Sequence, residues 1–504
     1  MSDSIASGTG RVVPPEPVEQ LTSQEPRPVV VGAPESEDRL GPTPRARRRS
    51  FQTYEQALAY LERRPNVERT RPSRLSPDAF KLDRMRLLAR TLGDPQEELR
   101  LVHVAGSKGK GSSVEMLSSC LDSCGYTVGV FTSPHLVDVR ERIRIGRDWI
   151  PKDDFRRLMA RVAGAASAVA ETHGDPTYFE VLTALALLYF ADQAVDVGVL
   201  ETGLGGRLDC TNIVTPAVTA LTAIQLEHTE ILGSTVEEIA REKAGIFKPG
   251  VPALTVPQTP EVLEVIRAEA ARIGAPLGVL GDDVEYTSRF EADKDLGPHA
   301  RVCIAGPRAS FEHMAVPLRG EHQAANCGLA LACLESLCGH GIQVTDGGVA
   351  DGLAKTPANG RMEMLWTEPR VLADGAHNPE SIRALIQAIG AAIRYDSMVV
   401  VFGCASDKDV DGMLREVDLG ADKVVFTRAS GSARSIEPEE LARRYEAITG
   451  GKMAQTAQTV KEAINTAARA VVRDDLICVA GSFLVAGEAK ALFDDKRQRT
   501  SQDA

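Results

Sequence analysis

Leu101-Val-His-Val-Ala105 is a short apolar run that leads directly into Gly106-Ser-Lys-Gly-Lys-Gly-Ser-Ser113. The run predicts a buried strand, and the residues that follow, about 113–124, have the composition of a helix. Glycines at 106, 109 and 111 allow backbone N–H groups to turn inward, and the start of the helix directs its positive dipole end to the same place. The stretch therefore predicts a strand, a phosphate-binding loop and a helix.

Two side chains of this loop suit a nucleotide. Lys110 can reach the β- and γ-phosphates, and the Ser112 hydroxyl can serve Mg²⁺. The common G-x-x-x-x-G-K-[ST] pattern is not met, because its first glycine would fall on Val104 and Gly111 intervenes before Ser112. An ordinary Gly/Ser turn is the alternative, but the position between a buried strand and a helix start favours phosphate binding.

Strand-like and helix-like segments alternate on both sides of this loop, which is typical of α/β folds with a mainly parallel sheet. At 504 residues the chain is long enough for two domains. We predict an N-terminal ATPase domain of the phosphate-loop type over 51–318, with short strands within 282–316. A C-terminal Rossmann-like α/β domain is predicted over 319–495.

The ends and the overall composition limit the class of protein. Residues 1–50 are rich in Pro, Ser, Gly and charge, so we expect a disordered tail there and a second loose tail over 496–504. The 58 Lys+Arg against 70 Asp+Glu give a net charge of −12, which argues against nucleic acid as the main partner. Nine scattered cysteines, no secretory signal and no long apolar run indicate a cytoplasmic protein with reduced thiols and no membrane span.

Two further residues with side chains that can bind metal come after predicted strands, as the glycine-rich loop comes after the strand at 101–105. Glu201 follows the apolar run 195–200, and His228 comes shortly after the run 217–224. The carboxyl ends of parallel strands line a common crevice, so both side chains are candidates for a metal–phosphate site. Taken alone, each would more often be a solvated or hydrogen-bonded surface residue.

The order of further motifs resembles the dihydrofolate synthase/folylpolyglutamate synthase family of the Mur ligase superfamily. The loop is similar to the family's G-T-N-G-K-G-S, with Ser107 and Lys108 in place of Thr-Asn, and Glu227 stands where the family has Asp. Asn359 replaces a proline. The matching blocks are Thr132-Ser-Pro-His-Leu136, Glu201–Asn212, Glu242–Gly250, Arg319–Cys327, Asn359–Glu363, Leu372–Pro379 and Ala480–Glu488.

The resemblance assigns roles to particular residues. It implies that Ser133, Glu201 and His228 hold Mg²⁺ and that Lys243 is carbamylated. It makes Lys110, Lys243 and His377 the catalytic groups, and His377 and Ser482 the groups that position glutamate. The ATP-binding residues that it implies are Gly106, Gly109, Lys110, Gly111, Ser112, Asn326, Arg361 and Asp374.

The implied reaction is ATP-dependent addition of L-glutamate to dihydropteroate, to reduced folates or to both, through an acyl phosphate, by a monomer that uses ATP and Mg²⁺. One alternative is another Mur-type amino-acid ligase, which would use the same chemistry on a different acceptor. A nucleotide-binding regulator is the alternative from another class. The Glu201, His228 and Lys243 positions disfavour a regulator, because switching needs no such set.

Overall fold

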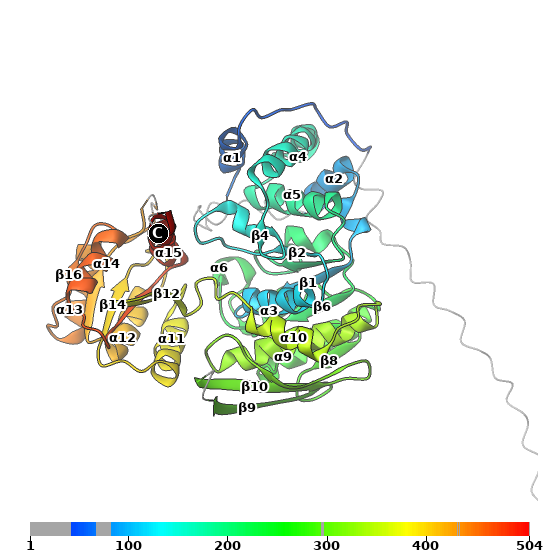
Figure 1. Cartoon of the computed structure of the whole chain (residues 1–504). Coiled ribbons are helices and arrows are strands. Elements are labelled where there is room, and N and C mark those ends of the chain that lie inside the picture. The colour runs from blue at the N-terminus through cyan, green and yellow to red at the C-terminus, as the bar shows by residue number, and fades with distance from the viewer. Residues whose placement is uncertain (1–41, 67–81, 294–296, 431, 433, 503–504) are drawn as a thin grey trace, which may run out of the picture. The chain divides into compact units, whose positions relative to one another are not determined.

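The computed structural model describes residues 42–66, 82–293, 297–430, 432 and 434–502 (Figure 1). Most of the predicted tail, residues 1–41, lies outside the described residues. Residues 42–50 have no helix or strand, but they are not the disordered tail that we expected. The Arg47 amide donates to the Gly164 carbonyl at 3.1 Å, and the Arg47 side chain pairs with Glu171. This segment therefore lies along a helix of the first lobe.

The first lobe, which we define as the described residues between 42 and 358, is built on an eight-stranded sheet of order β4-β3-β2-β5-β1-β6-β7-β8. The strands from β2 to β8 in this order run parallel, and β3 and β4 are antiparallel additions at one edge. The strands are β1 (Leu101–Ala105), β2 (Val128–Phe131), β3 (Ile143–Ile145), β4 (Asp148–Trp149), β5 (Val197–Glu201), β6 (Val218–Leu221), β7 (Ala253–Thr255) and β8 (Leu277–Val279).

Helices cover both faces of this sheet because the central strands are apolar on both sides. Val102 and Val104 of β1 pack in one core with α3, α9 and α10, whereas Leu101 packs in another with α1, α2, α4 and α5. A third core joins β6 to α7 and α8. The helices are α1 (Tyr54–Glu62), α2 (Leu82–Leu92), α3 (Lys110–Ser123), α4 (Lys152–His173), α5 (Tyr178–Asp192), α6 (Thr229–Leu232), α7 (Val236–Ala244), α8 (Pro260–Ile273), α9 (His322–Cys338) and α10 (Asp346–Ala354), with short 3₁₀ turns at Pro95–Glu98, Val139–Arg142 and Cys210–Ile213.

The predicted short strands within 282–316 form a separate three-stranded antiparallel sheet of order β11-β10-β9. Val302, Ile304 and Phe311 from this sheet pack with the first lobe's core. The strands are β9 (Glu285–Asp293), β10 (Gly297–Ala305) and β11 (Ser310–Ala315).

The predicted domain boundary at residue 318 is wrong. Helix α9 buries Leu329, Leu331 and Leu334 in the core that holds β1 and α3, and α10 adds Val349 and Leu353 to it. Both helices therefore belong to the first lobe, and the chain leaves that lobe near residue 359.

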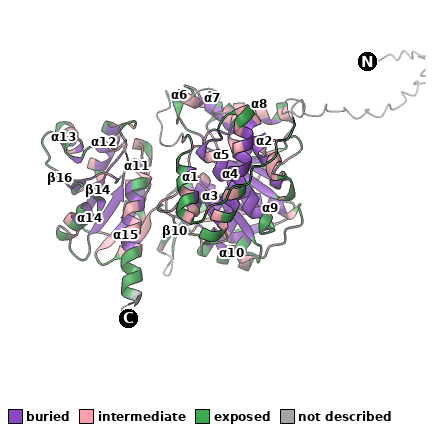
Figure 2. Cartoon of the chain, turned by 90° about the horizontal axis from the view of Figure 1, so that it is seen from above, coloured by how far each residue is buried: buried purple, intermediate pink, exposed green. Residues whose placement is uncertain are grey.

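The second lobe, residues 359–502, is a six-stranded sheet of order β12-β13-β17-β14-β15-β16, parallel except for β12. Side chains of β14 alternate between its two cores: Val400 packs with α11, α12 and α13, and Val401 packs with α14 and α15. Figure 2 shows these strands as buried and the helices as exposed on their outer faces. The elements are β12 (Glu363–Thr367), β13 (Arg370–Ala373), α11 (Pro379–Ala392), β14 (Met398–Phe402), α12 (Val410–Gly420), β15 (Lys423–Phe426), α13 (Pro438–Thr449), β16 (Gln455–Thr456), α14 (Val460–Arg469), β17 (Leu476–Ala480) and α15 (Phe483–Gln502).

The loose tail predicted over 496–504 is also wrong as far as the structure describes it. Helix α15 continues to Gln502. Trp366 stacks on Phe493 with ring centroids 5.5 Å apart, the Lys496 ammonium lies 4.3 Å from the Trp366 ring, and the Arg497 side chain donates to the Leu365 carbonyl. These contacts hold the last turns against β12. Within the described ranges, no helix combines the length and the apolar character needed to cross a bilayer.

Candidate active site

A cleft of 1110 Å³ is lined by residues of both lobes. It opens at the carboxyl ends of β1 and β5 of the first lobe and of β13 and β17 of the second, where ligands of parallel α/β sheets bind. The predicted site residues that line it are Gly109, Lys110, Gly111, Ser112, Ser133, Glu201, His228, Asn326, Arg361, Asp374, His377 and Ser482. Gly106 and Lys243, the remaining two, contact each other directly beside the cleft.

The glycine-rich loop is fastened to the neighbouring strand. The amides of Ser107 and Lys108 donate to the Ala223 carbonyl at 2.9 and 3.1 Å, and the Ser107 hydroxyl donates to the Gln225 carbonyl at 3.0 Å. Helix α3 begins at Lys110, three residues earlier than predicted, and its first-turn residues Lys110, Gly111 and Ser112 line the cleft. The Lys110 ammonium folds back onto the Gly106 carbonyl at 2.8 Å.

Two glycines of the loop are needed because other parts of the chain approach them closely. A Cβ at Gly109, where φ is 95°, would lie 2.2 Å from Asn326 Oδ1. A Cβ at Gly111 would lie 2.2 Å from Arg361 Nη2. Two of the three residues predicted to complete the nucleotide site from outside the loop, Asn326 and Arg361, therefore lie against it.

Glu201 is buried at the end of β5, and its Oε2 accepts from the Ser133 amide at 3.2 Å. Burial raises the pKa of Glu201, while Lys110 and Arg361 act to lower it. A carboxylate that is desolvated and lies near two cations is suited to a site where a divalent cation and phosphate bind together.

The donor set fits Mg²⁺ bound mainly through phosphate. Within the described ranges no three His, Cys, Asp or Glu side chains converge, so the protein offers Mg²⁺ no closed cage. Mg²⁺ commonly takes one or two protein oxygens together with phosphate and water, and Glu201 with the adjacent Ser133 can provide these. His228, at φ 46° before α6, faces the cleft. Desolvation of its imidazole by the surrounding protein lowers its pKa. It therefore stays neutral at pH 7 and able to act as a ligand.

Lys243 is buried in α7 and forms an ion pair beside the cleft. Its ammonium lies 2.6 Å from Glu227 Oε1 and 2.8 Å from the Gly106 carbonyl. Burial lowers the pKa of Lys243 to about 8, against the opposing effect of Glu227. A lysine with such a pKa has a substantial fraction of neutral, nucleophilic amine near neutral pH.

Asp374 follows β13 and connects the turn after it to the segment that precedes β12. Its carboxylate accepts from the amides of Met362 and Ala376, each at 2.8 Å. Burial raises the pKa of Asp374 to about 6, and the two amides, Arg361 and Lys108 counteract this rise. The carboxyl therefore changes charge close to physiological pH.

His377 and Ser482 lie at the second lobe's edge of the cleft. The His377 ring bonds through Nδ1 to the Gly375 carbonyl at 2.8 Å, and it lies 5.8 Å from the Phe483 ring. Burial, followed by Lys108, lowers the pKa of His377 to about 4, so the imidazole is neutral at pH 7. Its second nitrogen is left for a ligand. The Ser482 hydroxyl accepts from the Val485 amide at 3.1 Å.

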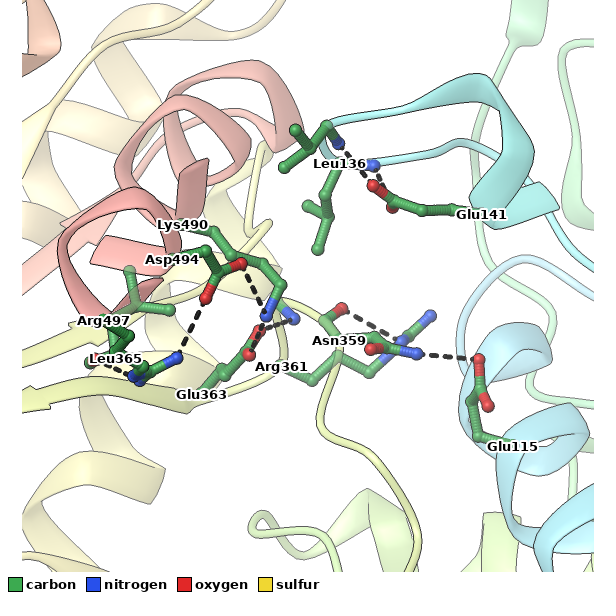
Figure 3. Close-up of polar contacts among 12 residues, drawn as sticks. Glu115, Leu136, Glu141, Asn359, Arg361, Glu363, Leu365, Lys490, Asp494 and Arg497 are labelled. Carbon is green, nitrogen blue, oxygen red and sulfur yellow. Dashed lines mark hydrogen bonds and ion pairs between the residues drawn. The ribbon is translucent and has the colours of Figure 1, made fainter. Parts of the chain in front are cut away.

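The sequence did not predict a link between helix α3 and the residues that enter the second lobe (Figure 3). The Asn359 side chain donates to Glu115 Oε1 at 2.9 Å, and the same oxygen pairs with Arg144 at 2.6 Å. The Asn359 carbonyl also accepts from Arg361 Nη1 at 3.2 Å. Asn359 therefore connects the phosphate-loop helix to the arginine beside Gly111. No local pattern signals this contact, because the two partners are 244 residues apart.

Three charged residues of the cleft were not predicted as site residues. Lys408, Asp407 and Glu227 all line the cleft. The charged run Asp407-Lys-Asp409 is the sequence signal that could have identified the first two, and the Asp-to-Glu replacement at 227 could have identified the third.

Comparisons with known families agree with this layout. Residues 152–334 match the Mur ligase middle domain, and residues 360–483 match the Mur ligase glutamate ligase domain. The break between the two matches falls between α9 and β12, which is consistent with a lobe boundary near residue 359 rather than 318.

The chain is 37% identical over 348 residues to the dihydrofolate synthase/folylpolyglutamate synthase of Bacillus subtilis, covering 68% of this chain and 80% of the relative. It is 35% identical to a probable bifunctional folylpolyglutamate synthase/dihydropteroate synthase of Halobacterium salinarum and spans 50% of that longer protein. The folylpolyglutamate synthase of Mycobacterium tuberculosis, solved with ADP and AMPPCP, superposes with a TM-score of 0.77 at 32% identity, covering 87% of this chain and 98% of that one.

Proposed function

Since this chain belongs to the dihydrofolate synthase/folylpolyglutamate synthase family of Mur ligases, we propose that it is an ATP-dependent amide ligase that joins L-glutamate to the carboxylate of a pteroate or folate. The observation that carries the proposal is a cleft that residues of both lobes line. A phosphate loop with Lys110 and a buried Glu201 line it from one lobe, and Asp374 with a neutral His377 line it from the other.

The first step is phosphoryl transfer to the acceptor. A carboxylate oxygen of the pteroate or folate attacks the γ-phosphorus, the bond to the β-phosphate oxygen breaks, and ADP leaves with the electron pair. Lys110, the amides at the start of α3 and Arg361 neutralise the charge on the phosphates, which is the main contribution a protein makes to this chemistry. Lys110 must leave the Gly106 carbonyl to do so.

The second step forms the amide. The amine of glutamate, after losing a proton, attacks the acyl carbon, and phosphate leaves with the former carboxylate oxygen. His377 and Ser482 orient the amine from the second lobe, and the neutral imidazole can accept its proton. Residues of both lobes enclose the reacting groups, which limits hydrolysis of the acyl phosphate by water.

Mg²⁺ and a modified lysine complete the proposed site. Glu201, Ser133 and His228 would hold Mg²⁺, which supplies charge neutralisation at the phosphates when bound. Carbamylation of Lys243 would replace a cation by an anion beside Glu227, so it requires that their ion pair open and that a cation compensate the two carboxylates. The lowered pKa of Lys243 favours the reaction of its amine with CO₂. Mass spectrometry of the native protein, with and without bicarbonate, tests this modification.

The proposed function is tested by ADP release with each acceptor offered separately. Dihydropteroate, dihydrofolate and tetrahydrofolate are each supplied with ATP, Mg²⁺ and glutamate, and one component is omitted in turn. We expect ADP only when an acceptor and glutamate are both present, together with a product heavier by one glutamyl residue. ADP release that needs neither would indicate a regulator, and release with another amino acid would indicate a different Mur-type ligase.

The proposal includes a cytoplasmic monomer. All nine cysteines are free in the structure, which suits a reducing compartment. Sedimentation velocity at several protein concentrations measures the oligomeric state.

A further inference from the structure

Lys108 is the loop position at which this chain departs from the family's asparagine, and it is held on a rigid base. Its amide donates to the Ala223 carbonyl at 3.1 Å, and the preceding Ser107 is bonded to Ala223 and Gln225. The side chain therefore projects from backbone that is tied to the end of β6. It lines the 1110 Å³ cleft.

The Lys108 ammonium is not neutralised by a partner from the described parts of the chain. Among residues that the structure describes, it forms no hydrogen bond or ion pair, whereas Lys110 bonds to the Gly106 carbonyl and Lys243 pairs with Glu227. Burial lowers the pKa of Lys108, with Glu227 opposing. A partly desolvated ammonium with three unused donors is costly unless an anion binds it.

The surroundings of Lys108 indicate which anion that is. Its charge acts on Asp374 and His377 of the second lobe as well as on Glu227 of the first, so it stands where the loop faces the second lobe. The amides at the start of α3 serve the inner phosphates of a nucleotide, and Lys110 reaches from there toward the β- and γ-phosphates. In the proposed reaction the terminal phosphate meets the acceptor between the two lobes, which is the side that Lys108 faces.

We propose that Lys108 binds the γ-phosphoryl group of ATP and neutralises its charge as the group passes to the acceptor carboxylate. The inference rests on the proposed function. Lys108 gives up and accepts no proton in this step: the bond between the γ-phosphorus and the β-phosphate oxygen breaks, the bond to the carboxylate oxygen forms, and ADP keeps the electron pair. Lys108 is thus a second lysine of the loop that acts on the γ-phosphate, in addition to Lys110.

A pair of nucleotides that differ in the γ-phosphate tests the assignment. Binding of ADP and of AMPPCP, both with Mg²⁺, is measured by calorimetry for the wild type, Lys108→Asn and Lys108→Arg. Asparagine is the residue of the resembled loop, so the backbone accommodates it. Lys461→Asn, on the exposed face of α14, removes one charge far from the cleft as a matched control.

We expect Lys108→Asn to weaken AMPPCP about tenfold, the loss of one charge-assisted contact, and ADP less than about twofold. Lys108→Arg should restore most of the AMPPCP affinity, and Lys461→Asn should change neither. Equal weakening of both nucleotides, or no weakening of AMPPCP, would overturn the assignment. So would an increase in KM for glutamate with nucleotide binding unchanged, since Lys108 would then serve the amino acid. Nucleotide binding is measured without acceptor or glutamate, so its outcome does not depend on ligase activity. A failure of the Lys108 assignment is therefore distinguishable from a failure of the proposed function.

Discussion

The ammonium groups of Lys110 and Lys243 donate to one acceptor, the carbonyl oxygen of Gly106, each at 2.8 Å. Lys110 comes from the helix that follows the phosphate loop, and Lys243 comes from α7, so this carbonyl joins the loop to a helix 137 residues away. Lys243 also holds Glu227, which leaves Lys110 as the lysine that is free to turn toward a nucleotide.

Replacement of Lys110 by Ala should stop turnover without unfolding the protein. The Gly106 carbonyl keeps Lys243 as its donor, so we expect a change in Tm of no more than about 2 °C. Loss of the charge at the phosphates should lower kcat/KM for ATP by at least about a hundredfold. Steady-state ADP release and a thermal melt measure both quantities, and near-normal turnover by Lys110→Ala would remove this lysine from the site.

Gly106→Ala and Gly125→Ala separate backbone strain from a clash. Both glycines have positive φ, 146° and 93°, but a Cβ at Gly106 would lie 1.8 Å from Thr222 Oγ1, whereas nothing lies within 4 Å of one at Gly125. We expect Gly125→Ala to cost about 1 kcal/mol in unfolding free energy and to bind AMPPCP normally. Gly106→Ala should weaken AMPPCP more than about tenfold, because the loop must move. Equal AMPPCP affinities for the two variants would contradict this reading.

The fold was predictable where buried strands appear in the sequence as short apolar runs. The strand at 101–105 is observed where the sequence placed it, and the apolar runs 195–200 and 217–224 contain most of β5 and all of β6, because a strand buried on both faces needs an unbroken apolar run. Helix α9 was placed in the wrong lobe, since an apolar helix does not specify which sheet it covers. The end of α15 is rich in charge and looked like a tail, and its contacts with Trp366 and Leu365 come from a distant strand.

The protonation of Asp374 should appear in the pH dependence of stability. Its pKa rises from 3.8 in the unfolded chain to about 6 in the fold, so between these values the folded state holds a proton that the unfolded state has released. The free energy of unfolding therefore falls as pH rises through this window, and the cost is complete above pH 6. Asp374→Asn has no titratable carboxyl at this position, so its stability lacks this pH-dependent cost.

We expect the stability difference between Asp374→Asn and the wild type to shift in favour of the variant by roughly 2 kcal/mol from about pH 4.5 to pH 7. Urea denaturation at the two pH values gives the difference. The lost hydrogen bond of the variant affects both values equally and cancels. A difference independent of pH would show that Asp374 titrates at its ordinary value.

The link from Asn359 to Glu115 should govern nucleotide affinity through Arg361. Asn359 has a φ of 43°, so Asn359→Gly removes the side chain without straining the backbone. We expect a loss of about 1 kcal/mol in unfolding free energy and a several-fold weaker AMPPCP complex. Asn359→Asp should do more harm, because it sets a carboxylate beside that of Glu115. Stability loss with unchanged AMPPCP affinity in both variants would reduce the link to a purely structural contact.

The site was predictable to the extent that its residues follow strands. Glu201, Asp374 and Ser482 each follow or end a buried strand, so topology alone brings them to the cleft. The ion pairs and hydrogen bonds between distant elements of the site were not predictable. The pairing of Lys243 with Glu227, and that of Glu115 with Asn359 and Arg144, depend on how separate elements pack, and nothing in the local sequence records it.

The central claim is that an acceptor carboxylate is activated by phosphorylation before glutamate captures it. An acceptor labelled with ¹⁸O in its reacting carboxylate tests this most directly, with the released phosphate analysed by mass spectrometry after a single turnover. The account predicts one ¹⁸O in the phosphate for each amide formed, because the phosphate leaves with the former carboxylate oxygen. Unlabelled phosphate accompanying a normal yield of amide would contradict it.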